Sequence, residues 1–100
     1  MRLRIKVINE TDTLKEPFTI EFNKGSKLLG FHSDDYQDKI LVYFENDKTE
    51  EKELRTFQFF SDGDKISNPD DMRYLGTRNS SSRYLFELLR IDKEIPVPVI

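Results

Sequence analysis

Apolar and polar side chains alternate along several short stretches of this chain, a period-two pattern that is typical of half-buried β-strands. In residues 2–8, Leu3, Ile5 and Val7 share one face while basic side chains occupy the other. In residues 18–22, apolar side chains again take every second position. Both stretches are therefore predicted to be strands that bury one face.

The middle of the chain holds three more extended stretches. Residues 27–32 are interrupted by Gly30, and a glycine inside a strand suggests a bulge or the close approach of another backbone. Residues 39–45 contain five consecutive apolar residues, mostly β-branched or aromatic, which indicates a strand buried on both faces. The charged stretch 46–53 then predicts a hairpin loop that leads into a strand at 54–60.

The C-terminal third combines a loop, a short strand and an ambiguous segment. Residues 61–71 hold Asp-Gly and Asn-Pro pairs, which are typical of turns, and residues 73–76 follow as a short strand. Residues 83–91 alternate as a strand does, which we favour, although their leucines also fit a single helix over 82–91. The chain is therefore predicted to be mainly β, a small antiparallel sandwich or barrel of about six or seven strands.

The length of 100 residues suits one domain. We expect a single β-rich domain over residues 1–100, with a core at 1–94 and an extended tail at 95–100, because Pro96 and Pro98 prevent a regular ladder. The tail either docks on its own domain, adds to a partner's sheet edge or occupies a groove. We favour docking on its own domain, because termini are ordered when they are tied down.

Composition narrows the class of protein. Apolar residues make up 36% of the chain, and eight Phe and four Tyr supply much of their volume, which predicts an aromatic-centred core. The absence of cysteine excludes disulfides and thiol chemistry. No apolar run approaches the roughly 18 residues of a membrane span, so we expect a soluble, cytoplasmic protein without a membrane partner.

Charge is unevenly placed along the chain. Residues 34–71 hold five basic and twelve acidic residues, whereas the segments 1–33 and 72–100 each carry a net charge of +2. The acidic middle either faces a basic partner, mimics nucleic-acid phosphates, or forms an ordinary solvated surface with acidic loops. The net charge of −3 argues against general nucleic-acid binding, which needs a basic footprint.

The usual signatures of catalysis and metal binding are missing from the sequence. His32 is the only histidine, and a lone histidine cannot build a histidine-ligated zinc site. The chain has no G-x-S-x-G nucleophile motif. The Asp-Gly-Asp at 62–64 lacks the ligand spacing of a calcium loop. We therefore expect no enzyme, no cofactor and no metal.

The loop 76–83 holds the strongest candidate for a ligand site. If residues 74–77 and 83–88 pair as a hairpin, two arginines sit at opposite ends of its loop, where their guanidinium groups could clamp one anion. Glycine, asparagine and serines in such a loop are equally explained by turn chemistry. The candidate anion-binding residues are Arg73, Arg78, Asn79 and Arg83.

Several of these motifs, in this order, resemble a group of small phage and prophage proteins. That group shows a T-I-E strand, a Gly turn before a Leu-rich strand, an Arg-x-Phe strand, a Tyr-x-Gly-Thr segment and a final strand ending in Phe-Glu. The resemblance covers residues 18–88. The matching positions are Thr19-Ile20-Glu21, Gly25, Leu28-Leu29, Arg55, Phe57, Tyr74-Leu75-Gly76-Thr77 and Phe86-Glu87.

The chain departs from the group at two places. Ser61-Asp62-Gly63-Asp64 stands where the group often has Gly-Thr-Gly, and Tyr84-Leu85 stands where it often has a histidine before Phe-Glu. An activity that depends on either feature would be missing here. The resemblance implies a β-rich fold and a phage setting, and it implies no biochemical function.

These observations predict a small non-enzymatic accessory or interaction protein of phage type, which binds a host or phage protein in the host cytoplasm. A homodimer through edge strands is a further prediction, because an all-β chain of this size leaves edges to be paired. The alternative is a binding protein for a phosphate-bearing metabolite or nucleotide, which would use the 76–83 loop and its arginines.

Overall fold

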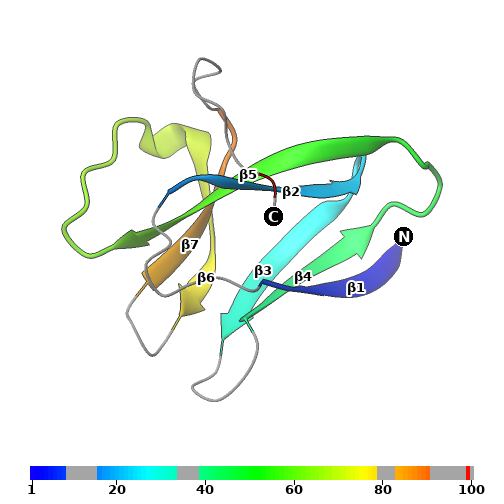
Figure 1. The fold of residues 1–100 in the computed structure, drawn as a ribbon, viewed down its shortest axis with the longest axis horizontal. Coiled ribbons are helices and arrows are strands. Elements are labelled where there is room, and N and C mark those ends of the chain that lie inside the picture. Colours follow the sequence, from blue (N-terminus) through cyan, green and yellow to red (C-terminus); the bar gives the residue numbers. More distant parts are fainter. Residues whose placement is uncertain (9–15, 34–38, 79–82, 91–98, 100) are drawn as a thin grey trace.

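The computed structural model describes residues 1–8, 16–33, 39–78, 83–90 and 99. The described residues form seven strands in one curled sheet and a single 3-10 turn, so the prediction of a mainly β fold is confirmed (Figure 1). The elements in chain order are β1 (Arg2–Val7), β2 (Phe18–Asn23), β3 (Lys27–Ser33), β4 (Lys39–Glu45), β5 (Lys52–Ser61), η1 (Pro69–Asp71), β6 (Met72–Arg78) and β7 (Arg83–Leu88).

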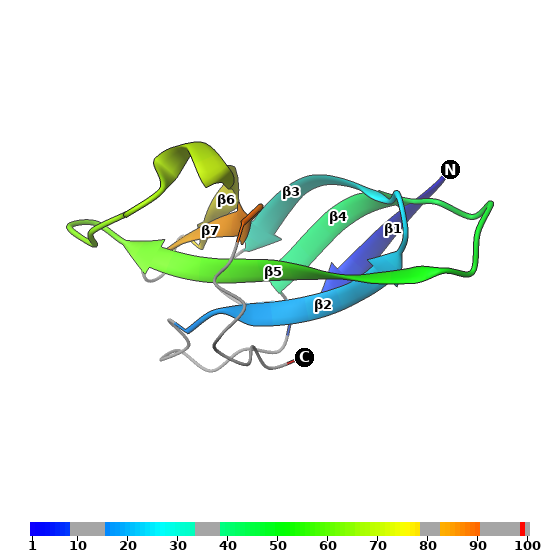
Figure 2. The same ribbon diagram turned by 90° about the horizontal axis from the view of Figure 1, so that it is seen from above.

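The sheet is an open half-barrel. Its strand order is β1-β4-β3-β6-β7-β5-β2, and every neighbouring pair is antiparallel except β3 and β6. Figures 1 and 2 show how the sheet curls and brings its end strands, β1 and β2, to the same open side. There the Lys6 ammonium lies 3.4 Å from the carbonyl oxygen of Glu21 and 5.5 Å from the centre of the Phe22 ring. A lysine side chain, rather than a hydrogen-bonded ladder, spans this gap.

The long connection between β4 and β5 differs from the prediction. Since β4 pairs with β1 and β3, and β5 pairs with β2 and β7, the expected hairpin loop over 46–53 was wrong. The segment instead leads from one part of the sheet to the other and packs on the turn between β2 and β3. The Asn46 amide donates to Ser26 Oγ (3.0 Å), and the Lys24 amide donates to the Glu51 carbonyl (2.7 Å).

The ambiguous segment near the C-terminus is a strand. β7 pairs with β5 on one side and β6 on the other, so the alternative helix over 82–91 does not form across its described residues. Leu85 and Glu87 point into the core, which is the alternation that favours a strand. The irregularity predicted at Gly30 is also confirmed, because the register of β3 against β4 shifts between Leu28 and Gly30.

Aromatic side chains fill the concave face of the sheet, as the composition predicts. Phe22 of β2 meets Tyr43 of β4 edge-on with ring centres 5.0 Å apart, and Phe31 of β3 meets Phe59 of β5 at 5.6 Å. These contacts join strands that are not neighbours in the sheet and so hold the curl. The buried apolar residues are Ile8, Phe18, Ile20, Phe22, Leu28, Phe31, Leu41, Tyr43, Phe57, Phe59, Leu75 and Leu85.

The single parallel junction divides the sheet into a three-strand half (β1, β4, β3) and a four-strand half (β6, β7, β5, β2). The backbones of β3 and β6 approach so closely there that a Cβ atom on Gly76 would lie 2.1 Å from the carbonyl oxygen of Phe31. A Cβ atom on Gly30 would lie 3.3 Å from the carbonyl oxygen of Leu75. Glycine at position 76 is therefore required for the two halves to join.

The tail is described at one residue only. Val99 forms a parallel bridge with Thr19, which places this point of the chain against the outer edge of β2. At Val99 the tail thus docks on its own domain, as the sequence favours. The remaining tail residues, 95–98 and 100, lie outside the described residues.

Candidate functional site

The structure brings together two of the four residues predicted to bind an anion. Arg78 and Arg83 lie directly opposite each other at the end of the β6–β7 hairpin. Arg73 lies at the other end of β6, where its guanidinium donates to the Leu28 carbonyl (2.7 Å), so it does not join them. Asn79 lies outside the described residues.

Arg78 and Arg83 belong to a longer basic row. The strand register sets five residues side by side across β4, β3, β6, β7 and β5, on the concave side at one end of the half-barrel. Arg78 is buried, and Arg83 has a buried Nη1 that finds no hydrogen-bond partner in the structure as described. Three cations and two hydroxyl groups in one row form a pattern that can hold a phosphate. The row consists of Lys39, Ser33, Arg78, Arg83 and Ser61.

A second charged cluster stabilises the fold. Arg55 and Glu87 form a bidentate ion pair with N–O distances of 2.6 and 2.9 Å, and their side chains are only 18% and 4% exposed. Arg55 also donates to the Ser26 carbonyl at 2.6 Å, so it links β5, β7 and the turn before β3. Both residues are among the motif positions singled out in the sequence, as is Gly76, and their contacts give these positions a structural explanation.

The apolar side chains of β1 do not face the core, contrary to the expectation of a half-buried strand. Leu3, Ile5 and Val7 point outward and are 62%, 59% and 42% exposed. The strand paired with it, β4, is also less buried than predicted, since Phe44 is 37% exposed and buries only part of its ring. The reason is position: β1 is the last strand of the sheet, and its inward positions carry Arg4 and Lys6 at the open side.

The register aligns the outward side chains of β1 and β4 in one continuous apolar surface. Leu3 lies opposite Phe44, Ile5 opposite Val42 and Val7 opposite Ile40, and paired residues of an antiparallel ladder share a face. We call these six residues the β1–β4 face. Lys27 and His32 of β3 continue the same rows, because they lie opposite Phe44 and Ile40, and both are exposed.

The second edge of β1 has no strand paired with it among the described residues. Its backbone amide and carbonyl groups can therefore accept another strand. The first residue is held in place because the N-terminal ammonium lies 3.1 Å from the Asp47 carboxylate. A hydrogen bond from this ammonium, and then its charge, lower the pKa of Asp47 below its usual value.

The β1–β4 face was not predicted, because the alternation in residues 2–8 placed their apolar side in the core. A signal was present in the same segment. Arg2, Arg4 and Lys6 occupy every second position, and three basic side chains cannot all point into an apolar interior. Inward-pointing charges are a common feature of strands at the edge of a sheet.

The part of the chain that the structure describes holds no group of three or more His, Cys, Asp or Glu side chains arranged for a metal ion. It also has no helix of the length and apolarity needed to cross a membrane. Comparison with family models, with curated proteins and with solved structures finds no match to the chain.

Proposed function

We propose that this protein is a non-enzymatic interaction protein that binds a partner protein through strand β1. The observation that carries the proposal is the exposure of Ile5. Its side chain is 59% exposed at the centre of an apolar face, on a strand whose second edge is not paired with any described strand. The resemblance to phage proteins suggests a host or phage protein as the partner, met in the host cytoplasm.

Two physical features support binding at this place. Contiguous apolar surface exposed to water is a common mark of a protein–protein contact. An unpaired strand edge adds main-chain hydrogen bonds, which give affinity, while pockets and side chains on alternate positions give specificity. Strand β1 (Arg2–Val7) combines both features, since it has exposed apolar side chains and an edge that is not paired with any described strand.

The basic residues of β1 suggest the chemistry of the partner. In a homodimer formed by antiparallel pairing of two β1 strands about Ile5, Arg4 would lie opposite Lys6 of the second copy. Like charges placed directly opposite destabilise a ladder. A partner strand that alternates apolar residues with Asp or Glu would instead match Arg4 and Lys6 on one face and Ile5 on the other.

Site-specific photocrosslinking tests the proposal. The variant Ile5→p-benzoylphenylalanine, incubated with a bacterial lysate and irradiated, is expected to form one dominant crosslinked product of higher mass. The matched control is Leu54→p-benzoylphenylalanine, because Leu54 is 56% exposed on β5, a strand inside the sheet, and lies opposite Glu21 of β2. The control is expected to form no such product.

A competition experiment gives the proposal a second test. The product should be lost when unlabelled wild-type protein is added in excess and retained when unlabelled Ile5→Lys protein is added. Identical products at positions 5 and 54, or no product at position 5 over a range of salt concentrations, would contradict the proposal. A product with twice the mass of the chain would support the homodimer through edge strands instead.

The basic row favours a second candidate function, the binding of a phosphate-bearing metabolite or nucleotide. It sets Arg78 beside Arg83, and two neighbouring guanidinium groups can hold one phosphate. Thermal-shift measurements with inorganic phosphate and nucleotides test it. A shift that Arg83→Gln removes and Arg90→Gln retains would support this function, and no shift at millimolar ligand would exclude it.

A further inference from the structure

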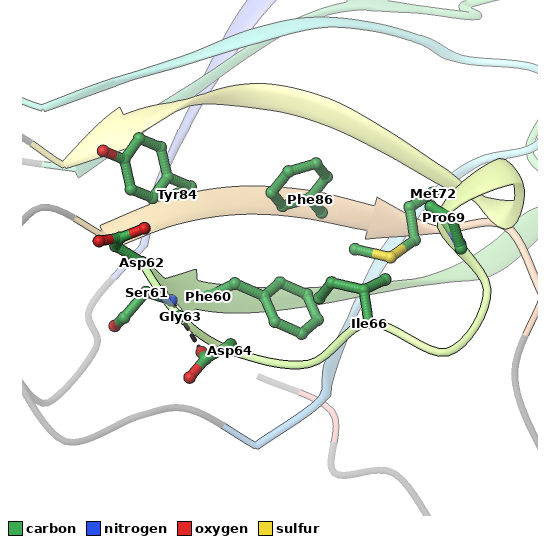
Figure 3. A pocket seen from close by; sticks show the side chains of 10 residues that line it. All are labelled: Phe60, Ser61, Asp62, Gly63, Asp64, Ile66, Pro69, Met72, Tyr84 and Phe86. Atoms are coloured by element: carbon green, nitrogen blue, oxygen red, sulfur yellow. Dashed lines mark hydrogen bonds between the residues drawn. The ribbon is translucent and has the colours of Figure 1, made fainter.

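A pocket of about 410 Å³ lies on the outer side of the four-strand half, between the sheet and the loop that joins β5 to β6 (Figure 3). Its volume falls in the range of ordinary small-ligand sites. The sequence predicts only a loop over residues 61–71, which supply one wall of this pocket. The lining residues are Phe60, Ser61, Asp62, Gly63, Asp64, Ile66, Pro69, Met72, Tyr84 and Phe86.

The floor of the pocket is a preformed aromatic surface. Phe60 of β5 meets Phe86 of β7 edge-on with ring centres 5.6 Å apart, and Phe86 also packs against Tyr74 at 5.4 Å. Both phenylalanines are half-buried, so part of each ring remains open to solvent. Met72 and Ile66 add apolar surface beside the rings (Figure 3). This floor can take an apolar stem or the face of a flat group.

The rim of the pocket is acidic. Figure 3 shows the carboxylates of Asp62 and Asp64 at the end of the pocket where Tyr84 presents its hydroxyl group. Asp64 accepts a hydrogen bond from the Ser61 amide at 2.8 Å, and its own amide donates to the Ser61 carbonyl at 3.1 Å. These bonds fix a tight turn in which Gly63 has φ +90°. The Asp64 carboxylate is therefore held at the rim by local structure, and Asp62 lies within the same turn.

The charge of this loop is predominantly negative. The ten lining residues include two aspartates and no basic residue. Over residues 61–71, four aspartates and one lysine give a net charge of −3. Such a site repels phosphate and carboxylate groups. It attracts cations, which also bind favourably over the faces of aromatic rings.

We propose that this pocket binds a cationic group carried on an apolar stem, with the stem on Phe60 and Phe86 and the cation between Asp62 and the hydroxyl of Tyr84. This chemistry is that of a lysine or arginine side chain in a peptide, and also that of a small alkylamine. The pocket is separate from the β1–β4 face, so this inference does not depend on the proposed function.

Nuclear magnetic resonance titrations test the charge of the ligand directly. The methyl signal of Met72 and the ring signals of Phe86 and Tyr84 report on the pocket, and Met1 provides a distant reference signal. Hexylammonium is expected to shift the pocket signals in a saturable way, whereas hexanoate, which has a similar stem and the opposite charge, is expected to leave them unchanged. Equal binding of the two probes, or binding of neither, would overturn the proposal.

A further pair of probes separates the two sources of the cation. N-acetyl-lysine methylamide carries the side chain alone, and the peptide Ala-Ala-Lys-Ala-Ala carries it on an extended backbone. Tighter binding of the peptide would assign the pocket to a protein partner, and equal or weaker binding would assign it to a small amine. The peptide with glutamate in place of lysine should not bind.

Two variants in the same loop provide the matched control. Asp62→Asn removes a lining carboxylate that is exposed and outside the Ser61–Asp64 turn bonds, and it is expected to weaken hexylammonium binding about fivefold, since exposed ion pairs are worth no more than that. Asp70→Asn removes an exposed carboxylate that does not line the pocket and should change binding by less than about twofold. Equal effects of the two variants would overturn the placement of the cation beside Asp62, because they would reflect only the net charge of the loop.

Discussion

The two halves of the curled sheet both turn apolar side chains outward, but these side chains are covered to different extents. On the four-strand half, the loop that joins β5 to β6 lies across the outer aromatic residues and makes a pocket with them. On the three-strand half, Leu3 and Ile5 remain exposed to solvent among the described residues. Outward apolar residues are thus partly covered by the chain itself in one half and remain available to a partner in the other.

The inward charges of the two halves differ in the same way. In the four-strand half, Arg55 and Glu87 satisfy each other at hydrogen-bonding distance while almost fully buried. In the three-strand half, Arg4 lies 3.9 Å from Glu45, and its side chain is 51% exposed. Buried pairs are costly to break, whereas exposed pairs contribute little. The four-strand half therefore carries more of the stability, and β1 is the part that can change its contacts.

The largest expected effect comes from the junction of the two halves. Gly76→Ala would place a methyl group 2.1 Å from the Phe31 carbonyl oxygen, a backbone atom that cannot move without opening the sheet. We expect it to lower the free energy of unfolding by about 3 kcal/mol or more, as severe overpacking does. Urea denaturation followed by circular dichroism measures the change.

Gly63→Ala is the control for this junction. Gly63 has φ +90° but nothing within 4 Å of the added atom, so only backbone strain opposes the substitution. The expected cost is about 1–2 kcal/mol. If Gly76→Ala costs no more than Gly63→Ala, the two halves are not held by the close approach of β3 and β6.

The second prediction compares the two ion pairs. Glu87→Gln leaves the Arg55 guanidinium almost buried without its counter-charge, and should lower the free energy of unfolding by about 2–4 kcal/mol. Glu45→Gln, at the exposed pair with Arg4, should cost less than about 1 kcal/mol. Denaturant midpoints of the two variants measure the difference. Similar costs would mean that burial does not distinguish the pairs.

The third prediction compares an outward aromatic residue from each half. Phe86→Ala removes a half-buried ring that packs on both Phe60 and Tyr74, and should cost about 2 kcal/mol. Phe44→Ala removes a ring that is 37% exposed on the β1–β4 face, and should cost below about 1 kcal/mol. Thermal unfolding of both variants measures these costs. Equal costs would mean that the β1–β4 face contributes as much to folding as the outer aromatic residues of the four-strand half.

The strands could be predicted from the sequence because their signal is local. Alternation alone places Phe18, Ile20 and Phe22 in the core, and it assigns residues 83–88 to a strand, as the structure does. Pairing is not local. The sequence suggests a hairpin after Glu45 because two strands follow each other there, but their partners are β1, β3, β2 and β7. Nothing between Glu45 and Lys52 specifies which strands lie beside them.

The sites depend on this pairing and were predicted less well. The meeting of Arg78 and Arg83 was predicted because a hairpin brings them together within a few residues. The rest of the basic row needs β3, β4 and β5 to be placed, and Lys39 therefore gave no signal. The pocket forms only when Asp62, in the loop after β5, lies near Phe86 of β7, and this depends on the pairing of β5 with β7. Alternation also cannot tell which face of an end strand is buried, so Ile5 was assigned to the wrong side.

The smallest expected effect tests how loosely β1 is held. The pKa of Asp47 is lowered by its hydrogen bond with the N-terminal ammonium, so this contact stabilises β1 above the unfolded-state pKa and is lost as the pH falls through the folded value. Hydrogen-exchange protection of the β1 amides should therefore fall more than that of β7 as the pH drops from 6 to below the ordinary aspartate pKa of 3.8. In Asp47→Asn the β1 amides should already be less protected at pH 6 and should change less with pH, while Asp70→Asn should behave like the wild type. An unchanged pH dependence in Asp47→Asn would mean that β1 is held by its ladder with β4 alone.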